Sequence, residues 1–226
     1  KKETTAGVLL PEGDDAAMAM ATAFTDRIKA ETENEDAITV YEEYTPGDKD
    51  FSAQLEAVEK AGVKSVLLPG DNIDSINIIK QASDMGLDVV FLGDKDWSSD
   101  EFQDLADGVA TDANTAFVNF YAADEAVNEE AEKFLKAYHE KYGENSVPED
   151  AVALGYDSYI IALDAIDRAD DDATGEEIRD VLKEERSFQG ASGTITFNTT
   201  GDPIKTAYIS TWRDGELVSI YTVDPV

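Results

Sequence analysis

Short runs of apolar residues alternate with longer amphipathic stretches over the first two thirds of the chain. The stretch from Ile38 to Asn72 shows the pattern clearly. Residues 38–41 are rich in β-formers, a Pro-Gly-Asp turn follows, and residues 51–61 repeat their apolar positions with helical spacing. Asp50 is placed to cap this helix and Gly62 to end it. The pattern predicts a strand, a loop and a helix in that order.

Several of the apolar runs lack polar alternation, as in Val66-Leu67-Leu68. Strands of this kind are typically buried on both faces of a parallel sheet. Similar runs predict strands at 6–10, 89–92 and 115–119, and the intervening stretches predict helices from Asp14 or Asp15, from Asp74 or Ser75, near Phe102, and over 128–142. Alternating strands and helices predict an α/β fold with a doubly wound parallel sheet.

The pattern changes after Gly143. Residues 152–169 predict a long helix that is apolar on more than one side, through Leu154, Tyr156, Tyr159, Ile160, Ile161, Leu163 and Ile166. A helix that is apolar over so much of its girth is expected to be covered on most of it. A helix capped by Thr174, a strand at 193–197 and a hairpin around Asp214-Gly215 follow.

Polar turns leave two of the predicted strands at the ends where open α/β sheets bind ligands. Residues 69–72 follow one strand and residues 93–98 follow another. The candidate ligand-binding residues in these turns are Asp71, Asn72, Asp94, Lys95, Asp96 and Trp97. Each has a second interpretation: Asp71 and Asn72 as turn formers, Lys95 as an exposed ion pair, and Trp97 as a packing residue.

The chain is strongly acidic: 18 basic and 50 acidic side chains give a formal net charge of −32. Nucleic acids and anionic membranes are therefore poor partners. The acidic residues are spread over the presumed solvent faces, which we interpret as a halophilic adaptation, because the Debye length falls to about 3 Å at molar salt. No cysteine, membrane-spanning run or signal-peptide pattern is present, and an earlier removal of a leader is compatible with this.

Catalysis has little support in the sequence. The chain has no G-x-S-x-G, P-loop or G-x-G-x-x-G motif and one histidine. A flavodoxin-like hydrolase or transferase would need a nucleophile and a base at the strand ends. Ser98 and Ser99 are available, but no histidine lies near them in sequence. We therefore expect a binding protein without a catalytic residue, metal or cofactor.

Four motifs occur in the same order as in the substrate-binding proteins of branched-chain amino-acid ABC transporters: DKDFSAQL, IIKQASDMGLDVVFLGDKDW, ALGYDSYIIALDAI and GTITFNTTGDP. The chain resembles this family over essentially its whole length. The resemblance implies two α/β lobes of the periplasmic-binding-protein type, which close on a small ligand. It also implies an ABC transporter permease as partner and a place at the outer face of the cell, secreted or lipid-anchored.

The resemblance assigns residues 1–143 to the second lobe, 144–203 to a segment that returns to the first lobe, and 204–226 to a hairpin that crosses back. The first-lobe sheet itself has no counterpart in the sequence. The helix at 152–169 would then lack part of its cover. We therefore expect this truncated chain to self-associate.

The family's site residues carry over unevenly. An aromatic residue after the third second-lobe strand falls on Asp71, and the acid that holds the ligand ammonium falls on Lys95. An aromatic residue of the first exit loop falls on Ala16, whereas a tyrosine near the start of the returning helix is kept as Tyr156.

A lysine at the place of the ammonium-binding acid predicts a ligand of negative or neutral character there. Alternatively, Asp94 or Asp96 reaches the ammonium, and the ligand is an amino acid of the branched-chain type. The second functional hypothesis is a ligand-sensing domain of a receptor or regulator with the same fold.

Overall fold

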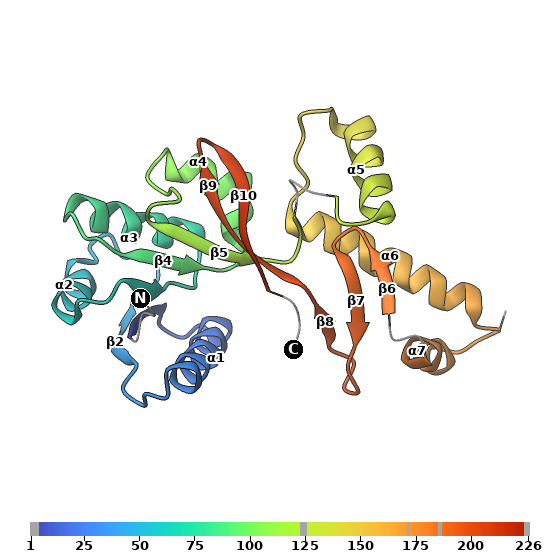
Figure 1. Cartoon of the computed structure of the whole chain (residues 1–226), viewed down its shortest axis with the longest axis horizontal. Coiled ribbons are helices and arrows are strands. Elements are labelled where there is room, and N and C mark those ends of the chain that lie inside the picture. Colours follow the sequence, from blue (N-terminus) through green and yellow to red (C-terminus); the bar gives the residue numbers. More distant parts are fainter. Residues whose placement is uncertain (1–4, 123–125, 171, 185–186, 224–226) are drawn as a thin grey trace. The chain divides into compact units, whose positions relative to one another are not determined.

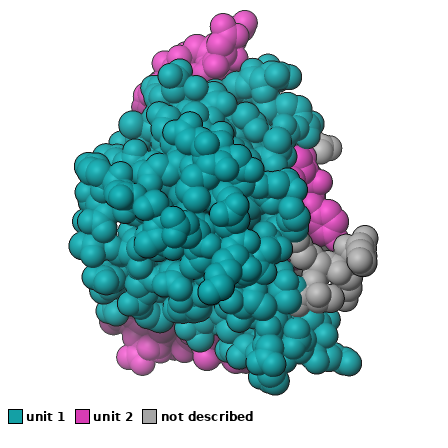
Figure 2. All heavy atoms as spheres, turned by 90° about the vertical axis from the view of Figure 1, so that its left-hand side faces the viewer, with its two compact units in different colours: residues 1–118, 211–218 teal, residues 119–210, 219–226 magenta. Residues whose placement is uncertain are grey.

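The computed structural model describes residues 5–122, 126–170, 172–184 and 187–223. The chain forms two compact units (Figure 2). Unit 1 contains residues 1–118 and 211–218, and unit 2 contains residues 119–210 and 219–226. The chain therefore passes between the units three times, at 118/119, 210/211 and 218/219.

Unit 1 is built from alternating strands and helices, as predicted (Figure 1). Its elements are β1 (Ala6–Pro11), α1 (Asp15–Thr32), β2 (Ile38–Tyr44), α2 (Ser52–Ala61), β3 (Ser65–Leu67), α3 (Asn72–Asp84), β4 (Val90–Gly93), the 3-10 helix η1 (Lys95–Ser98), α4 (Asp100–Ala106) and β5 (Thr115–Asn119). These strands pair in parallel in the order β5-β4-β3-β1-β2. Two C-terminal strands, β9 (Ala207–Arg213) and β10 (Glu216–Val223), extend the sheet beyond β5. The predicted α/β fold with a mostly parallel sheet is confirmed.

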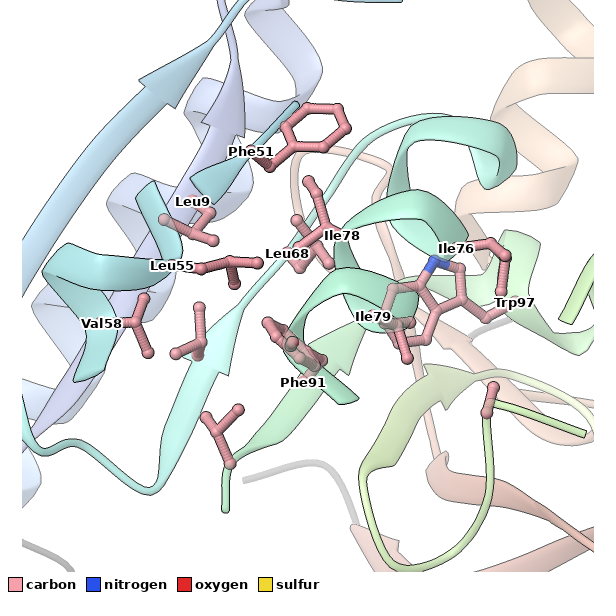
Figure 3. Close-up of a cluster of buried hydrophobic side chains, with 14 of the residues drawn as sticks. Leu9, Phe51, Leu55, Val58, Leu68, Ile76, Ile78, Ile79, Phe91 and Trp97 are labelled. Carbon is pink, nitrogen blue, oxygen red and sulfur yellow. The ribbon is translucent and has the colours of Figure 1, made fainter. Parts of the chain in front are cut away.

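Both faces of this sheet are covered. Successive residues of a strand point to opposite faces, so Val8 packs in a cluster with Ala21 of α1 while Leu9 packs in a larger cluster with α2 and α3. Figure 3 shows this larger cluster, in which Leu55 and Ile79 meet the strands. The double coverage explains why the strand sequences lack polar alternation.

Local signals set most helix ends. Asp14 caps α1 by accepting from two backbone N–H groups, and Gly62 ends α2 in the left-handed conformation at φ 67°, as predicted. The predicted start of α3 at Asp74 or Ser75 is wrong. Asp71 is the N-cap, because its carboxylate accepts from the Asp74 N–H at 2.9 Å, and the helix begins at Asn72.

Unit 2 contains α5 (Glu129–Tyr142), α6 (Asp150–Arg168), α7 (Gly175–Glu184) and an antiparallel sheet of β6 (Ser187–Gly190), β7 (Gly193–Phe197) and β8 (Pro203–Lys205). Its apolar core joins Tyr121, Phe134 of α5, Ala153 of α6 and Ala191. Because α5 packs here, the units divide at 118/119, whereas the sequence placed the lobe boundary near residue 143.

The last two strands form the predicted hairpin: β9 (Ala207–Arg213) and β10 (Glu216–Val223). Asp214 and Gly215 join them with positive φ values of 53° and 83°. Positive φ at both turn positions suits the twist of a two-residue hairpin. Both strands contain a passage between the units.

Helix α6 buries one side and exposes the other. Ala153, Ile161 and Ala165 are buried, whereas Tyr159 and Ile166 are 63% and 54% exposed. The described part of the chain thus leaves much of this apolar helix uncovered, which agrees with the expectation that the helix at 152–169 lacks part of its cover. In the same part of the chain, no helix combines the length and apolarity needed to cross a bilayer.

The partly buried amine of Lys205, in β8, leads us to expect that the stability of unit 2 depends on pH. Burial lowers the pKa of Lys205 to about 8 from 10.5, although Asp157 and Asp150 oppose this shift. Between these two values the unfolded chain binds a proton that the folded chain does not, so the contribution of Lys205 to the free energy of unfolding rises with pH. We expect urea titrations at pH 7 to 10 to show this rise relative to Lys205→Met. Parallel curves for the two proteins would contradict it.

Candidate functional site

Loops at the carboxyl ends of β1, β2, β3 and β4 meet at one edge of unit 1. They line two neighbouring cavities of about 570 and 310 Å³. The larger is lined by Gly47, Lys49, Asp71, Asn72, Ile73, Asp74, Asp96, Ser99 and Glu101. The smaller is lined by Asp14, Ala16, Ala17, Met20, Pro69, Gly70, Asp71, Asp94 and Asp96. The structure therefore brings together Asp71, Asn72, Asp94 and Asp96 of the two polar turns, whereas Lys95 and Trp97 line neither cavity.

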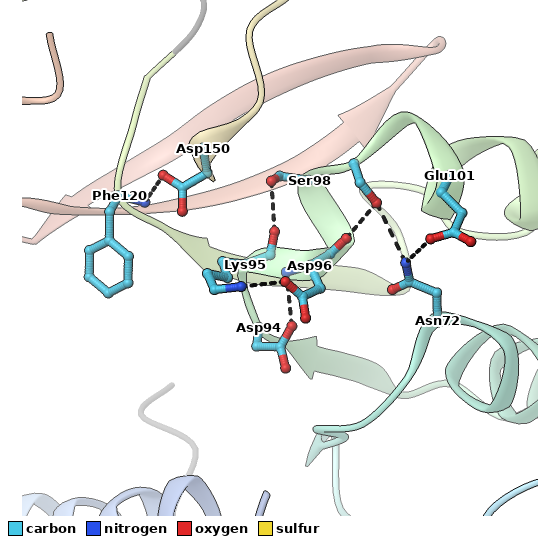
Figure 4. Close-up of polar contacts among 9 residues, drawn as sticks. Asn72, Asp94, Lys95, Asp96, Ser98, Glu101, Phe120 and Asp150 are labelled. Atoms are coloured by element: carbon cyan, nitrogen blue, oxygen red, sulfur yellow. Dashed lines mark hydrogen bonds and ion pairs between the residues drawn. The ribbon is translucent and has the colours of Figure 1, made fainter. Parts of the chain in front are cut away.

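At the start of α3, Asp71 has a structural role, whereas Asn72 has one side-chain oxygen without a hydrogen-bond partner in the described part of the chain. Asp71 is exposed and its side chain caps α3, so the interpretation of Asp71 as a turn former is correct. The Asn72 amide nitrogen lies 3.5 Å from Ser99 Oγ and 3.4 Å from Glu101 Oε2 (Figure 4). The buried Oδ1 of Asn72 has no hydrogen-bond partner in the described part of the chain. It is an acceptor available to a donor group.

Asp94, Lys95 and Asp96 form a compact polar turn (Figure 4). Asp94 accepts from the Asp96 N–H at 2.9 Å, and Lys95 Nζ lies 2.5 Å from Asp96 Oδ1. Burial raises the pKa of the Asp94 carboxyl, and the charges of Asp96 and Asp14 raise it further. Asp96 offsets the Lys95 charge, so carboxylates dominate the smaller cavity. This favours a positively charged ligand group in the smaller cavity, whereas Lys95 in the sequence predicted a negative or neutral one.

Two further residues at this edge carried no clear sequence signal. Asp74 is 1% exposed, and its Oδ2 accepts from the Gly47 N–H at 2.8 Å. Burial raises the pKa of Asp74. Tyr44, at the end of β2, is also buried, and burial followed by the charges of Asp74, Asp71 and Asp14 raises its phenol pKa. The field at this edge is therefore strongly negative.

Trp97 belongs to the core, and its predicted ligand contact is wrong. Its side chain is 0% exposed and stacks on Phe102 with a centroid distance of 4.8 Å. Gly93 makes this possible, because a side-chain carbon at Gly93 would lie 2.1 Å from the indole. The turn of η1 directs the ring inward, and Trp97 lines neither cavity. The packing interpretation is correct.

Tyr156 lies in unit 2, on α6. Its hydroxyl donates to Glu130 Oε1 at 2.7 Å, and its ring packs against Phe134 of α5 at a centroid distance of 5.0 Å. The hydrogen bond to Glu130 raises the pKa of Tyr156 to about 12. Tyr156 therefore joins α5 to α6 within unit 2, and its role toward a ligand stays a prediction.

The chemistry at the unit 1 edge suits binding. Carboxylates, one amide oxygen and backbone groups can hold a cationic or hydrogen-bond-donating ligand. Over the described ranges, no three histidine, aspartate or glutamate side chains are grouped so as to hold a metal ion.

Comparisons with known proteins agree with this fold. The profile of the family described as periplasmic binding protein matches residues 3–216. Leu/Ile/Val-binding protein homolog 3 from Brucella melitensis is 28% identical over 182 residues, which cover 80% of this chain and 47% of that protein. The chain thus spans about half the length of this curated relative.

Two solved structures are similar over nearly the whole chain. The leucine-binding protein LivK from Thermotoga maritima has a TM-score of 0.85 and 26% identity, covering 98% of this chain and 61% of that one. The branched-chain amino acid transporter substrate-binding protein LivJ from Streptococcus pneumoniae, in complex with isoleucine, has a TM-score of 0.80 and 26% identity, covering 98% and 60%. With a family profile that matches almost every residue, this chain belongs to the periplasmic binding protein family.

Proposed function

We propose that this chain acts in an extracytoplasmic solute-binding protein, which captures an amino acid of the branched-chain type between two lobes and delivers it to an ABC importer. The observation that carries the proposal is the acidic cavity at the carboxyl edge of unit 1, formed by Asp14, Asp71, Asp94 and Asp96. The names of the similar proteins, which refer to leucine, isoleucine and valine, support the ligand class.

In this proposal Asp94 holds the ammonium group of the ligand. Its carboxylate is partly desolvated, so a cation beside it replaces the lost hydration and forms a charge-assisted hydrogen bond. Ala16, Ala17 and Met20 line the same cavity and offer apolar contacts to an aliphatic side chain. Ligand binding stabilises the closed state through its higher affinity for that state.

The lobe assignment belongs to the same proposal. Residues 1–143 correspond to the second lobe of the family, residues 144–203 to the segment that returns to the first lobe, and 204–226 to the hairpin that crosses back. The protein would work at the outer face of the membrane, secreted or lipid-anchored, with a permease as partner. Binding and delivery, without catalysis, would be its whole activity.

Calorimetry with leucine on a protein that carries both lobes tests the proposal. We expect Asp94→Asn to weaken binding by about tenfold to a hundredfold, because it removes one charge-assisted hydrogen bond. Lys95→Glu should not weaken leucine binding, since it removes the positive charge that Asp96 offsets and adds a carboxylate beside the acidic cavity. Asp88→Asn is the control, because Asp88 is an exposed partner of Lys64 outside both cavities. Unaltered leucine affinity in Asp94→Asn would overturn the role of Asp94, and no binding of any amino acid would overturn the function.

Self-association of the isolated chain is a separate expectation. The exposed side of α6 presents Tyr159, Leu163 and Ile166. Burying each such side chain contributes about 1.5–3 kcal/mol, and contiguous apolar patches mark interfaces. We expect light scattering on the 226-residue chain at high salt to show a dimer or larger species. Leu163→Glu with Ile166→Glu should give a monomer, whereas the neighbouring Ser158→Glu should not. A monomeric chain that binds little apolar-surface dye would contradict this.

A further inference from the structure

The larger of the two cavities at the carboxyl edge of unit 1 is not used by the ligand contacts proposed above. It adjoins the smaller cavity, because Asp71 and Asp96 line both. In the proposed function the α-ammonium group of the ligand lies at Asp94 and its aliphatic side chain at Ala16 and Met20, all of which line the smaller cavity. The neighbouring space of about 570 Å³ is therefore open to a longer ligand that starts at Asp94.

The wall of the larger cavity is acidic. Four of its lining residues carry a carboxyl group, namely Asp71, Asp74, Asp96 and Glu101, and one, Lys49, carries an amine. Lys95 lies outside the cavity and offsets part of the Asp96 charge. An excess of carboxylates remains after both lysines are counted. A negative ligand group would be repelled in this cavity, whereas a positive group would be attracted.

Asn72 provides an independent sign that the cavity receives a donor. Its amide nitrogen lies 3.5 Å from Ser99 Oγ and 3.4 Å from Glu101 Oε2, so the orientation of the amide is fixed. Its Oδ1 is buried and has no hydrogen-bond partner among the residues that the structure describes. Figure 4 shows the nitrogen turned toward Glu101 and the oxygen turned toward the side of Asp96, which both cavities share. Buried acceptors are normally paired, so this oxygen points to a ligand N–H group.

The opposite wall of the cavity is held in place by α3. This wall is the loop between β2 and α2, which lines the cavity through Gly47 and Lys49. The Gly47 N–H donates to Oδ2 of Asp74, a residue that is 1% exposed, at 2.8 Å. Gln81 accepts from the Phe51 N–H at 2.8 Å and donates to the Lys49 carbonyl at 3.0 Å. Because one helix carries the amide acceptor and fastens the loop, the cavity has its shape before a ligand binds, which favours binding.

We propose that the site accepts a second class of ligand, amino acids with a positively charged side chain, whose cationic group lies in the larger cavity against Asn72 Oδ1, Glu101 and Asp96. This inference rests on the proposed function, because it keeps the α-ammonium group at Asp94. A guanidinium group suits these acceptors, since it is planar, stays charged and presents five N–H donors. The flexible methylene chain of a basic amino acid joins its two cationic groups, so one ligand can occupy both cavities.

Calorimetry on the two-lobed protein with L-arginine and L-citrulline tests this proposal. The two amino acids have nearly the same shape, but only the side chain of arginine is charged. The titrations are made in molar potassium chloride, where the Debye length is about 3 Å, so that the general attraction of cations to an acidic chain contributes little. We expect L-arginine to bind about tenfold or more tightly than L-citrulline, as one charge-assisted hydrogen bond implies.

Two variants locate the cation. Glu101→Gln and Asn72→Leu each remove an acceptor of the larger cavity with little change in size, and each should reduce the preference for arginine about threefold or more without altering the leucine affinity. Glu56→Gln in α2 and Asn77→Leu in α3 are the matched controls, because neither residue lines a cavity of this edge, and both should keep the preference. Asp94→Asn should weaken the binding of leucine and arginine alike.

Equal affinities for arginine and citrulline would overturn the proposal. So would a preference for arginine that persists in both Glu101→Gln and Asn72→Leu, because the cation would then lie outside the larger cavity. Binding of leucine without binding of arginine would refute this inference and leave the proposed function standing. Binding of arginine without binding of leucine would refute the branched-chain ligand class and leave this inference standing.

Discussion

The melting temperature of the chain should rise by about 10 °C or more between dilute buffer and molar potassium chloride, which corresponds to a few kcal/mol for a chain of this size. A net charge of −32 on 226 residues makes the folded state repel itself. Screening shortens the range of this repulsion from about 10 Å at 0.1 M salt to about 3 Å at 1 M.

The surface ion pairs cannot offset this repulsion. Pairs such as Arg27 with Glu31 and Lys64 with Asp88 have both partners exposed, and exposed pairs contribute about 0–1 kcal/mol each. The high-salt interpretation of the acidic composition is a proposal that this experiment tests directly.

Circular dichroism melts at several salt concentrations provide the measurement. A variant with Glu56→Gln, Glu140→Gln and Glu184→Gln serves as the control, because all three side chains are exposed. Removing three negative charges should raise the melting temperature in dilute buffer and have little effect in molar salt. Equal melting temperatures of the unmodified chain in both buffers would exclude a halophilic role for its charge.

Replacement of Trp97 by alanine should lower the free energy of unfolding by about 3–5 kcal/mol, the usual cost of removing a buried aromatic side chain. The indole is fully buried against Phe102 and Phe117. The Trp97 carbonyl also accepts from the Trp212 indole N–H at 2.8 Å, so a shift of the η1 backbone would disturb β9 as well.

Urea denaturation at high salt measures this loss. Trp97→Phe keeps an aromatic ring and should cost less than Trp97→Ala. Tyr221→Ala, at a position that is 68% exposed and outside the α6 patch, is the matched control and should change stability by about 0.5 kcal/mol or less. A loss below about 1 kcal/mol in Trp97→Ala would mean that Trp97 does not support the core.

Local sequence patterns predicted most of the secondary structure. The strand at 115–119 and the helix over 128–142 agree with β5 and α5 to within one residue, and Asp14 caps α1 and Gly62 ends α2 as expected. These features depend on neighbouring residues, because a capping side chain bonds to a backbone group two or three positions away. The short strands β6 and β8 were not predicted, since a few residues carry too weak a period.

The edge of unit 1 that carries the two cavities was only partly predicted from the sequence. Asp71, Asn72, Asp94 and Asp96 were identified because polar turns after parallel strands meet at one edge. Asp74 was not, because in sequence it appeared only as a possible start of α3. The sequence left open whether Lys95 was paired, and the structure places it on Asp96.

By itself, the sequence determined the order of strands and helices, the parallel character of the sheet, the edge at which polar turns gather and the extreme negative charge. These follow from periodicity, turn residues and composition, each a property of adjacent positions. Only the tertiary structure decided that Trp97 is buried, that α5 belongs to unit 2 and that Asp74 holds the loop at Gly47. Each of these depends on contacts that form when distant segments fold together. The spacing and composition of neighbouring residues do not specify such contacts.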